Sequence, residues 1–168
     1  MIENGGEKSK RHCSLSEIMK YVIAFLIAVY VIILFVHSSG SNKSFAEVER
    51  PIKESVNFEE MKDVGGQGLK RYYGLNKADY EGALLYISNF NLSAEEVLMI
   101  KVKDEEQVQT VVDAIDKRLE NRKNDFEGYA PNEVKLLDEA QKSVRGKFIF
   151  LSVGKQAEHY KKIFSDSL

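Results

Sequence analysis

The chain is poor in the residues that build metal centres and nucleophilic active sites. It contains one cysteine, three histidines and no tryptophan among 168 residues. The cysteine, Cys13, precedes the longest apolar run, so the rest of the chain has no internal disulfide. His159 has no histidine or cysteine near it in sequence, which is typical of a surface residue. The sequence therefore predicts no catalytic residue, no cofactor-binding residue and no metal site.

An excess of either charge is also missing. Lysine and arginine number 24 against 26 aspartates and glutamates, which gives a formal net charge of −2. Proteins that bind nucleic acid concentrate positive charge on one face, and this balance argues against such a partner. No internal repeat or low-complexity tract is present.

What the sequence does contain is one long apolar run, Tyr21–Val36, of sixteen residues without a charge. As a helix the run spans roughly 24 Å, somewhat less than a hydrocarbon core of ~30 Å. Ile18 and Met19 extend it, and Lys20 can reach the headgroups. A core helix would carry a polar face, and this run has none. The run therefore predicts one transmembrane helix.

The run could be a retained anchor or a cleaved signal peptide. Ser38 and Gly40 are small residues that would suit cleavage before Ser41. However, the run is longer than the usual ~7–15 apolar residues of a signal peptide, which favours an uncleaved signal anchor. A lipoprotein is excluded, because Cys13 precedes the run instead of following it.

Basic residues predict the orientation of this anchor. Lys8, Lys10, Arg11 and Lys20 precede the run, whereas the nearest basic residue after it is Lys43. Cytoplasmic flanks are the more basic ones, so we expect a cytoplasmic amino terminus and an extracytoplasmic carboxyl-terminal domain at the cell membrane. The predicted order is a cytoplasmic disordered tail (1–17), a transmembrane signal anchor (18–39), a linker (40–44) and an extracytoplasmic α+β domain (45–168).

Apolar spacing predicts the elements of that domain. Helical spacing runs through residues 45–56, although Pro51 should delay the helix past Glu49 or kink it, and the pattern continues over 57–64. Alternation then predicts strands over 81–88 and 97–103, joined closely enough to be antiparallel. In the second strand we expect Lys101 and Lys103 to lie opposite the apolar face.

The remaining pattern predicts a long helix capped by Asp104, a helix that begins at Pro131, a hairpin over 143–153 that turns at Gly146, and a final helix over 156–164. Together these elements predict an α+β fold, a small antiparallel sheet with helices gathered on one face and one transmembrane helix before it.

Four motifs could carry function, and for each we favour a simpler interpretation. Gly65–Gly68 lacks the strand and the lysine-serine pair of a phosphate loop and is expected to be a flexible turn. Glu95 and Glu96 point to opposite sides of a strand and are expected to be solvated. Near Gly74, tyrosines 72 and 73 should pack on the core with wet hydroxyls. The cations of the long helix, expected to be solvated and to complement its dipole, are Lys117, Arg118, Arg122 and Lys123.

Three stretches together resemble a bacterial family, the domain of unknown function 4358. They are 95–104 (EEVLMIKVKD), the helix end 126–131 (FEGYAP) and 144–150 (VRGKFIF), and the resemblance covers roughly residues 45–164. It implies an envelope protein of Firmicutes with an amino-terminal membrane or lipoprotein signal. It implies no activity, so no functional residue is transferred.

Two functions remain open. The first is a non-enzymatic, membrane-anchored module that binds an envelope protein or another envelope component. The alternative is an envelope hydrolase with a dispersed carboxylate site, because catalytic carboxylates need only be close in space. A reversed anchor with a cytoplasmic domain is a third arrangement, since the difference in basic residues is modest.

Overall fold

The computed structural model describes residues 15–38, 43–57 and 59–168, apart from the side chains of 15–18 and 33–38. Most of the predicted tail and residues 40–42 of the predicted linker lie outside this part. The chain divides after Ser38 into two units, which are described separately. The first contains α1 (Leu15–Ser38), where most of the described apolar side chains are exposed. Within the described ranges, we find no helix with the length and hydropathy of a membrane span.

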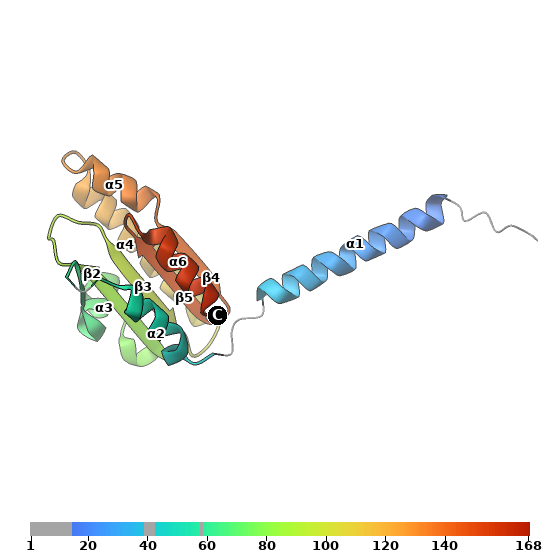
Figure 1. Ribbon diagram of the computed structural model, residues 1–168, viewed down its shortest axis with the longest axis horizontal. Helices are drawn as coiled ribbons and strands as arrows, with labels where there is room; N and C mark the ends of the chain where they lie inside the picture. The colour runs from blue at the N-terminus through green and yellow to red at the C-terminus, as the bar shows by residue number, and fades with distance from the viewer. Residues whose placement is uncertain (1–14, 39–42, 58) are drawn as a thin grey trace, which may run out of the picture. The chain divides into compact units, whose positions relative to one another are not determined.

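The second unit has the predicted α+β class and is built on a five-stranded antiparallel sheet (Figure 1). The strand order is β1-β2-β3-β5-β4. The strands are β1 (Met61–Asp63), β2 (Gly82–Ser88), β3 (Glu96–Lys101), β4 (Gln141–Arg145) and β5 (Phe148–Val153). The helices are α2 (Phe45–Ser55), α3 (Gly65–Tyr73), α4 (Gln107–Phe126), α5 (Pro131–Asp138) and α6 (Ala157–Asp166), with a short 3-10 turn η1 (Lys77–Asp79).

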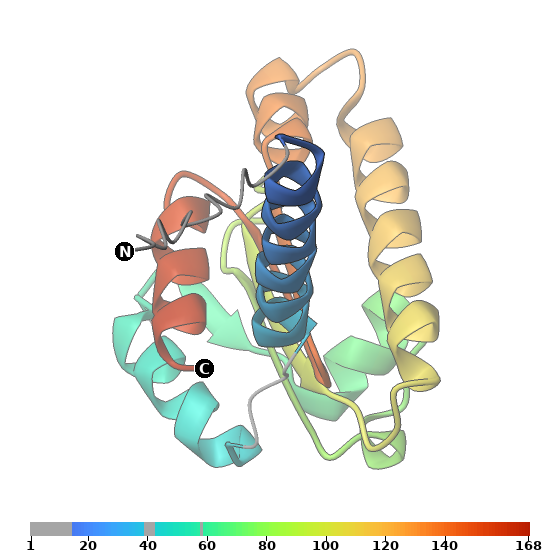
Figure 2. The ribbon, with the colours of Figure 1, turned by 90° about the vertical axis from the view of Figure 1, so that its right-hand side faces the viewer.

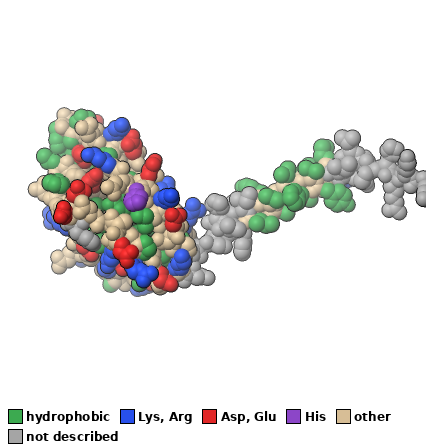
Figure 3. Space-filling view, viewed as in Figure 1, with side chains coloured by type: hydrophobic (Ala, Val, Ile, Leu, Met, Phe, Trp, Pro, Cys, Tyr) green, Lys and Arg blue, Asp and Glu red, His purple; other side chains and the backbone are tan. Residues whose placement is uncertain are grey.

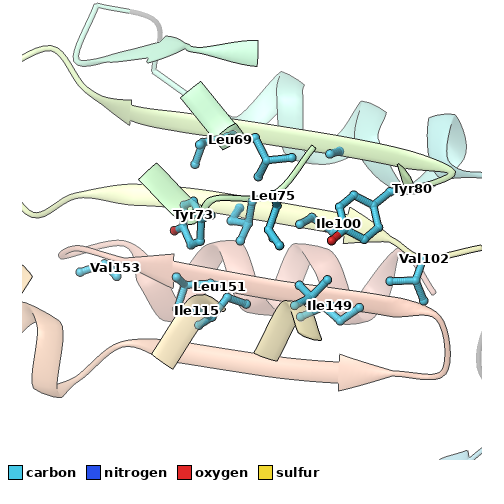
Figure 4. Close-up of a cluster of buried hydrophobic side chains, with 14 of the residues drawn as sticks. Leu69, Tyr73, Leu75, Tyr80, Ile100, Val102, Ile115, Ile149, Leu151 and Val153 are labelled. Carbon is cyan, nitrogen blue, oxygen red and sulfur yellow. The ribbon is translucent and has the colours of Figure 1, made fainter. Parts of the chain in front are cut away.

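Helices cover both faces of this sheet, so the prediction that they gather on one face is wrong. Helices α3 and α4 lie on one side and α2 and α6 on the other (Figure 2). Each face has its own core. Leu98 and Ile100 of β3 belong to the first, whose side chains from α3, α4 and β5 point toward one another in Figure 4. Val97 and Met99 belong to the second, together with aromatic residues of β5 and α6.

Coverage on both faces also buries Lys101. It lies opposite the face of Leu98 and Ile100, as expected, but it is only 8% exposed. Its Nζ donates to the backbone oxygen of Lys43 at 2.9 Å and to Glu81 Oε1 at 2.6 Å. The strand ends against the segment that enters the domain, and this end of the sheet, marked by Lys43 and Lys101, is called the entry end below.

Local signals shape the amino-terminal part differently from the prediction. Helix α2 begins at Phe45 despite Pro51, because Ser44 and Glu47 form a reciprocal capping box that satisfies the first free N–H groups. Residues 57 and 59–64 do not continue the helix. Met61–Asp63 pairs instead with Tyr86–Ser88 as an edge strand, which is too short to reveal alternation in the sequence.

The glycine-rich segment Gly65–Gly68 is helical. Helix α3 begins at Gly65, whose N–H donates to Asp63 Oδ1 at 2.8 Å, so the predicted flexible turn is wrong. Gly68 is required within this helix, because an added Cβ would lie 2.3 Å from the Val64 side chain. Gly74 ends the helix in the left-handed conformation, which glycine adopts readily.

The carboxyl-terminal half follows the prediction closely. The α4 stripe packs on the first core, Pro131 begins α5, and Gly146 turns the β4–β5 hairpin with φ 54°. Only the cap differs. The side chain of Asp104 does not cap α4, and Gln107 Oε1 instead accepts from the N–H groups of Lys103 and Asp104 at 3.0 and 3.3 Å.

We predict that Gly82→Ala destabilises the domain, because its new Cβ would lie 2.2 Å from the Phe45 ring. Overpacking of this kind costs about 1–3 kcal/mol in the free energy of unfolding. Urea titration followed by circular dichroism would measure it. In a Phe45→Ala background the same substitution should cost far less, and an equal cost in both backgrounds would contradict the close contact.

Candidate binding site at the turn end of the sheet

The loop between β2 and β3 is held in place by the helices behind it. Arg122 Nη2 of α4 donates to the backbone oxygen of Ser93 at 2.8 Å, and the N–H of Ala94 donates to Glu133 Oε2 of α5 at 2.7 Å. Phe90 and Leu92 are nevertheless 65% and 69% exposed. It is unusual for a loop held in place to expose two large apolar side chains to water. We call this end of the sheet, where the β2–β3 loop lies, the turn end.

A buried ion pair lies directly behind the loop. Glu96, the first residue of β3, is 2% exposed. Its Oε2 accepts from Arg118 Nη2 at 3.0 Å and from Nε at 3.3 Å, and its Oε1 accepts from the Tyr73 hydroxyl at 3.0 Å. The pair therefore joins β3 to α4 and α3. Both oxygens of this carboxylate are occupied by neighbours.

Aromatic rings complete the environment of Arg118. Its guanidinium carbon lies 4.9 Å from the ring centre of Tyr72 and 5.9 Å from that of Tyr73. Burial disfavours its charge, but the neighbouring carboxylate of Glu96 outweighs this effect and raises the pKa of Arg118. Burial, followed by the charge of Glu96, raises the pKa of the Tyr73 phenol well above its ordinary value. At neutral pH the site thus holds an ionised pair and a neutral phenol donor.

A small hollow opens beside this pair. It encloses about 190 Å³ and includes the cations Lys62, Arg118 and Arg122 in its wall, together with Tyr72 and Phe90. We call it the basic hollow. Among the described residues, Lys62 forms no ion pair, while Arg122 Nη1 lies 3.6 Å from the exposed Asp125. The acids in its wall are Glu95 and Glu96, and Glu96 is already neutralised by Arg118.

A second hollow lies on the other side of the same loop. It encloses about 390 Å³, and its wall includes Glu60, Glu95, Glu133 and Tyr160. We call it the acidic hollow. The two hollows share Phe90, Ser93 and Glu95. On the face seen in Figure 3, acidic and basic side chains are interspersed.

The structure corrects the expected solvation of these charges. Glu96 is buried and paired, whereas the neighbouring Glu95 faces the hollows. Arg118 and Arg122 are 15% and 17% exposed instead of solvated, and Lys123 bridges to Asp138 at 2.5 Å. Tyr73 packs on the core as expected, but its hydroxyl donates to Glu96 and is not wet.

The sequence contains a signal for this pair beyond those considered above. Glu96 has the same parity as Leu98 and Ile100, so strand alternation places it on a core face. Arg118 follows Ile115 by three residues, which places it on the buried stripe of the long helix. Opposite charges at core-facing positions of a strand and of a helix indicate a buried ion pair.

The other motifs do not add to this site. Gly65–Gly68 lies within α3, and His159 is exposed, as expected of a surface residue. In the described part of the chain, no group of three or more histidine, cysteine, aspartate or glutamate side chains is suitably placed to hold a metal ion.

A family model matches residues 54–154, which include the buried pair, the basic hollow and most of the wall of the acidic hollow, under the description Domain of unknown function (DUF4358). The chain belongs to this family. No curated protein and no solved structure matches the chain. The DUF4358 match is narrower than the resemblance over residues 45–164, because it omits most of α2 and all of α6. It confirms the family and assigns no activity to it.

We predict that Arg118→Met destabilises this DUF4358 domain by about 3–5 kcal/mol, because it leaves Glu96 buried without a counter-charge. The free energy of unfolding would be measured by urea titration. Lys117→Met, at an exposed position of the same helix, is the matched control and should change it little. Adding Glu96→Gln to Arg118→Met should restore part of the loss. No recovery in the double variant would show that packing, and not charge burial, sets the cost.

Proposed function

We propose that this chain is a membrane-anchored binding module of the bacterial cell envelope, and that the basic hollow takes an anionic group of its ligand. One observation carries the proposal. The wall of the basic hollow contains Lys62, Arg118 and Arg122. Beside it, Phe90 is exposed on the β2–β3 loop, which the helices hold in place. Polar groups that converge on a concave, partly apolar site are typical of ligand recognition.

The size of the hollow limits what can enter. The basic hollow has a volume of about 190 Å³. Pockets that enclose drug-sized ligands usually exceed ~300 Å³. A carboxylate or phosphate with a short body fits, whereas a whole sugar chain or nucleotide does not. The ligand therefore contributes one anionic end to this hollow, and the rest of it lies along the loop.

The hydrolase alternative has weaker support. Glu95 and Glu96 both border the basic hollow, as two catalytic carboxylates would. However, both oxygens of Glu96 are occupied, one by Tyr73 and the other by Arg118. A general acid or nucleophile needs a free oxygen aimed at the substrate. Within the basic hollow, Glu95 therefore has no second free carboxylate of the kind that such a mechanism uses.

The sequence is the reason that the proposal includes a membrane anchor. Tyr21–Val36 is apolar throughout, and α1 exposes large apolar side chains such as Phe25 and Leu26. The basic residues before the run favour an extracytoplasmic domain. Within the domain, β3 runs from the turn end at Glu96 to the entry end at Lys101, so the chain enters at the opposite end of the sheet from the hollow.

We predict that Lys62→Gln weakens binding of N-acetylalanine, a small carboxylate, about tenfold, because it removes one charge-assisted contact of the order of 1.4 kcal/mol. Isothermal titration calorimetry on the full chain in detergent would measure the dissociation constant. Lys142→Gln, on the distant strand β4, is the control and should leave the constant unchanged. Equal weakening by both variants, or no binding by the unsubstituted chain, would contradict a carboxylate site in this hollow.

We also predict that protease added to intact protoplasts digests the domain while the remaining anchor stays in the membrane. The physical reason is the positive flank before the run, which favours retention of the amino terminus in the cytoplasm. Immunoblots against tags at both ends would follow the fragments. Protection of the domain until lysis would reverse the proposed orientation. A shortened chain in the untreated sample would instead indicate a cleaved signal.

A further inference from the structure

The acidic hollow contains negative charge that the protein itself leaves unpaired. Among the described residues, Glu60, Glu95 and Glu133 make no ion pair, although Lys155 borders the same space. Glu133 accepts one hydrogen bond, from the N–H of Ala94, and that bond does not neutralise it. Three carboxylates around one hollow repel one another, and a cation that enters would relieve the repulsion.

The negative charges of two of these carboxylates, Glu95 and Glu60, both act on Tyr160. This side chain is 7% exposed and borders the hollow. Burial, followed by the charges of Glu95 and then Glu60, raises the pKa of its phenol. Glu60 precedes β1 and Glu95 precedes β3, so their convergence is a product of the fold and not of sequence proximity.

The geometry favours an organic cation over a metal ion. The three carboxylates are not placed together as a metal-binding group within the described part of the chain. A hollow of about 390 Å³ is also far larger than a dehydrated metal ion needs. An ammonium group accepts dispersed carboxylate partners, because its three N–H donors can point to different sides. Tyr160 adds an aromatic wall, and such walls attract ammonium groups.

The two hollows lie side by side, because Phe90, Ser93 and Glu95 form part of both walls. We infer that the turn end binds a short peptide with a free carboxylate and a free amino group, the carboxylate in the basic hollow and the ammonium in the acidic hollow. The apolar body of the peptide lies against Phe90, which is 65% exposed. This inference rests on the proposed anion site and adds the second charge and the class of ligand.

Opposite charges in adjacent hollows should make the site selective for a zwitterion over a singly charged ligand. A ligand with only the carboxylate end leaves the three glutamates unpaired, and one with only the amino end leaves Lys62 unused. A zwitterion satisfies both, so its affinity exceeds that of either singly charged form. Each added charge contact at a partly exposed site should change the dissociation constant about tenfold.

Four forms of trialanine test the inference on the full chain in detergent. They are the free peptide, its N-acetyl form, its C-terminal amide, and the peptide blocked at both ends. Isothermal titration calorimetry at pH 7 should give the tightest binding for the free peptide. We expect about tenfold weaker binding for each singly blocked form and none for the doubly blocked form.

Two variants separate the hollows. Glu60→Gln removes one carboxylate of the acidic hollow at an exposed position. It should weaken the free peptide about tenfold and leave the N-acetyl form unchanged. Lys62→Gln should weaken both of these forms, since each retains its carboxylate. Glu120→Gln, at an exposed position of α4 that borders neither hollow, is the matched control and should alter neither.

The outcomes distinguish the inference from the function on which it rests. If the free and N-acetyl peptides bind equally well, the acidic hollow takes no ammonium group and the inference fails, while the anion site stands. If the amide binds as well as the free peptide, the anion site fails. If no form binds, both fail.

Discussion

The burial of one carboxylate, Glu96, is the constraint on which the rest of the domain depends. An ionised group removed from water is costly unless it is paired and fully hydrogen-bonded. Arg118 and Tyr73 satisfy both oxygens from two different helices. Since neither helix can move along β3 without breaking this arrangement, the pair sets the register of α3 and α4 against the sheet.

The same pair shapes the surface that we propose to be functional. Arg118 is held against Tyr72 and Glu96 and forms part of the wall of the basic hollow. One turn further along α4, Arg122 ties down the β2–β3 loop through Ser93 and stacks on Phe126, with its guanidinium carbon 4.2 Å from the ring centre. Arg118 and Arg122 are thus positioned before any ligand arrives, which reduces the entropy lost on binding. A rigid framework behind a loop is a common way to present recognition residues.

The sheet shows why alternation was an incomplete guide to this fold. β3 is buried on both faces, because α3 and α4 cover one and α2 and α6 the other. Its two ionisable residues, Glu96 and Lys101, stand at opposite ends of the strand, where a helix residue or an incoming segment can pair with them. A lysine opposite an apolar face is usually solvated, and only coverage of that face by α2 and α6 makes it a buried partner.

The sequence by itself determined the elements whose signals are local. These are the antiparallel β2–β3 pair, the long apolar stripe of α4, Pro131 at the start of α5 and the turn at Gly146, because each depends on neighbours within a few residues. It did not determine the second covered face or the three-residue strand β1, which depend on contacts made far along the chain. The candidate site belongs to the second kind. Glu60 and Lys62 flank the start of β1, Glu95 precedes β3 and Arg122 lies in α4. Only the packing of these distant segments around the β2–β3 loop brings their charges together.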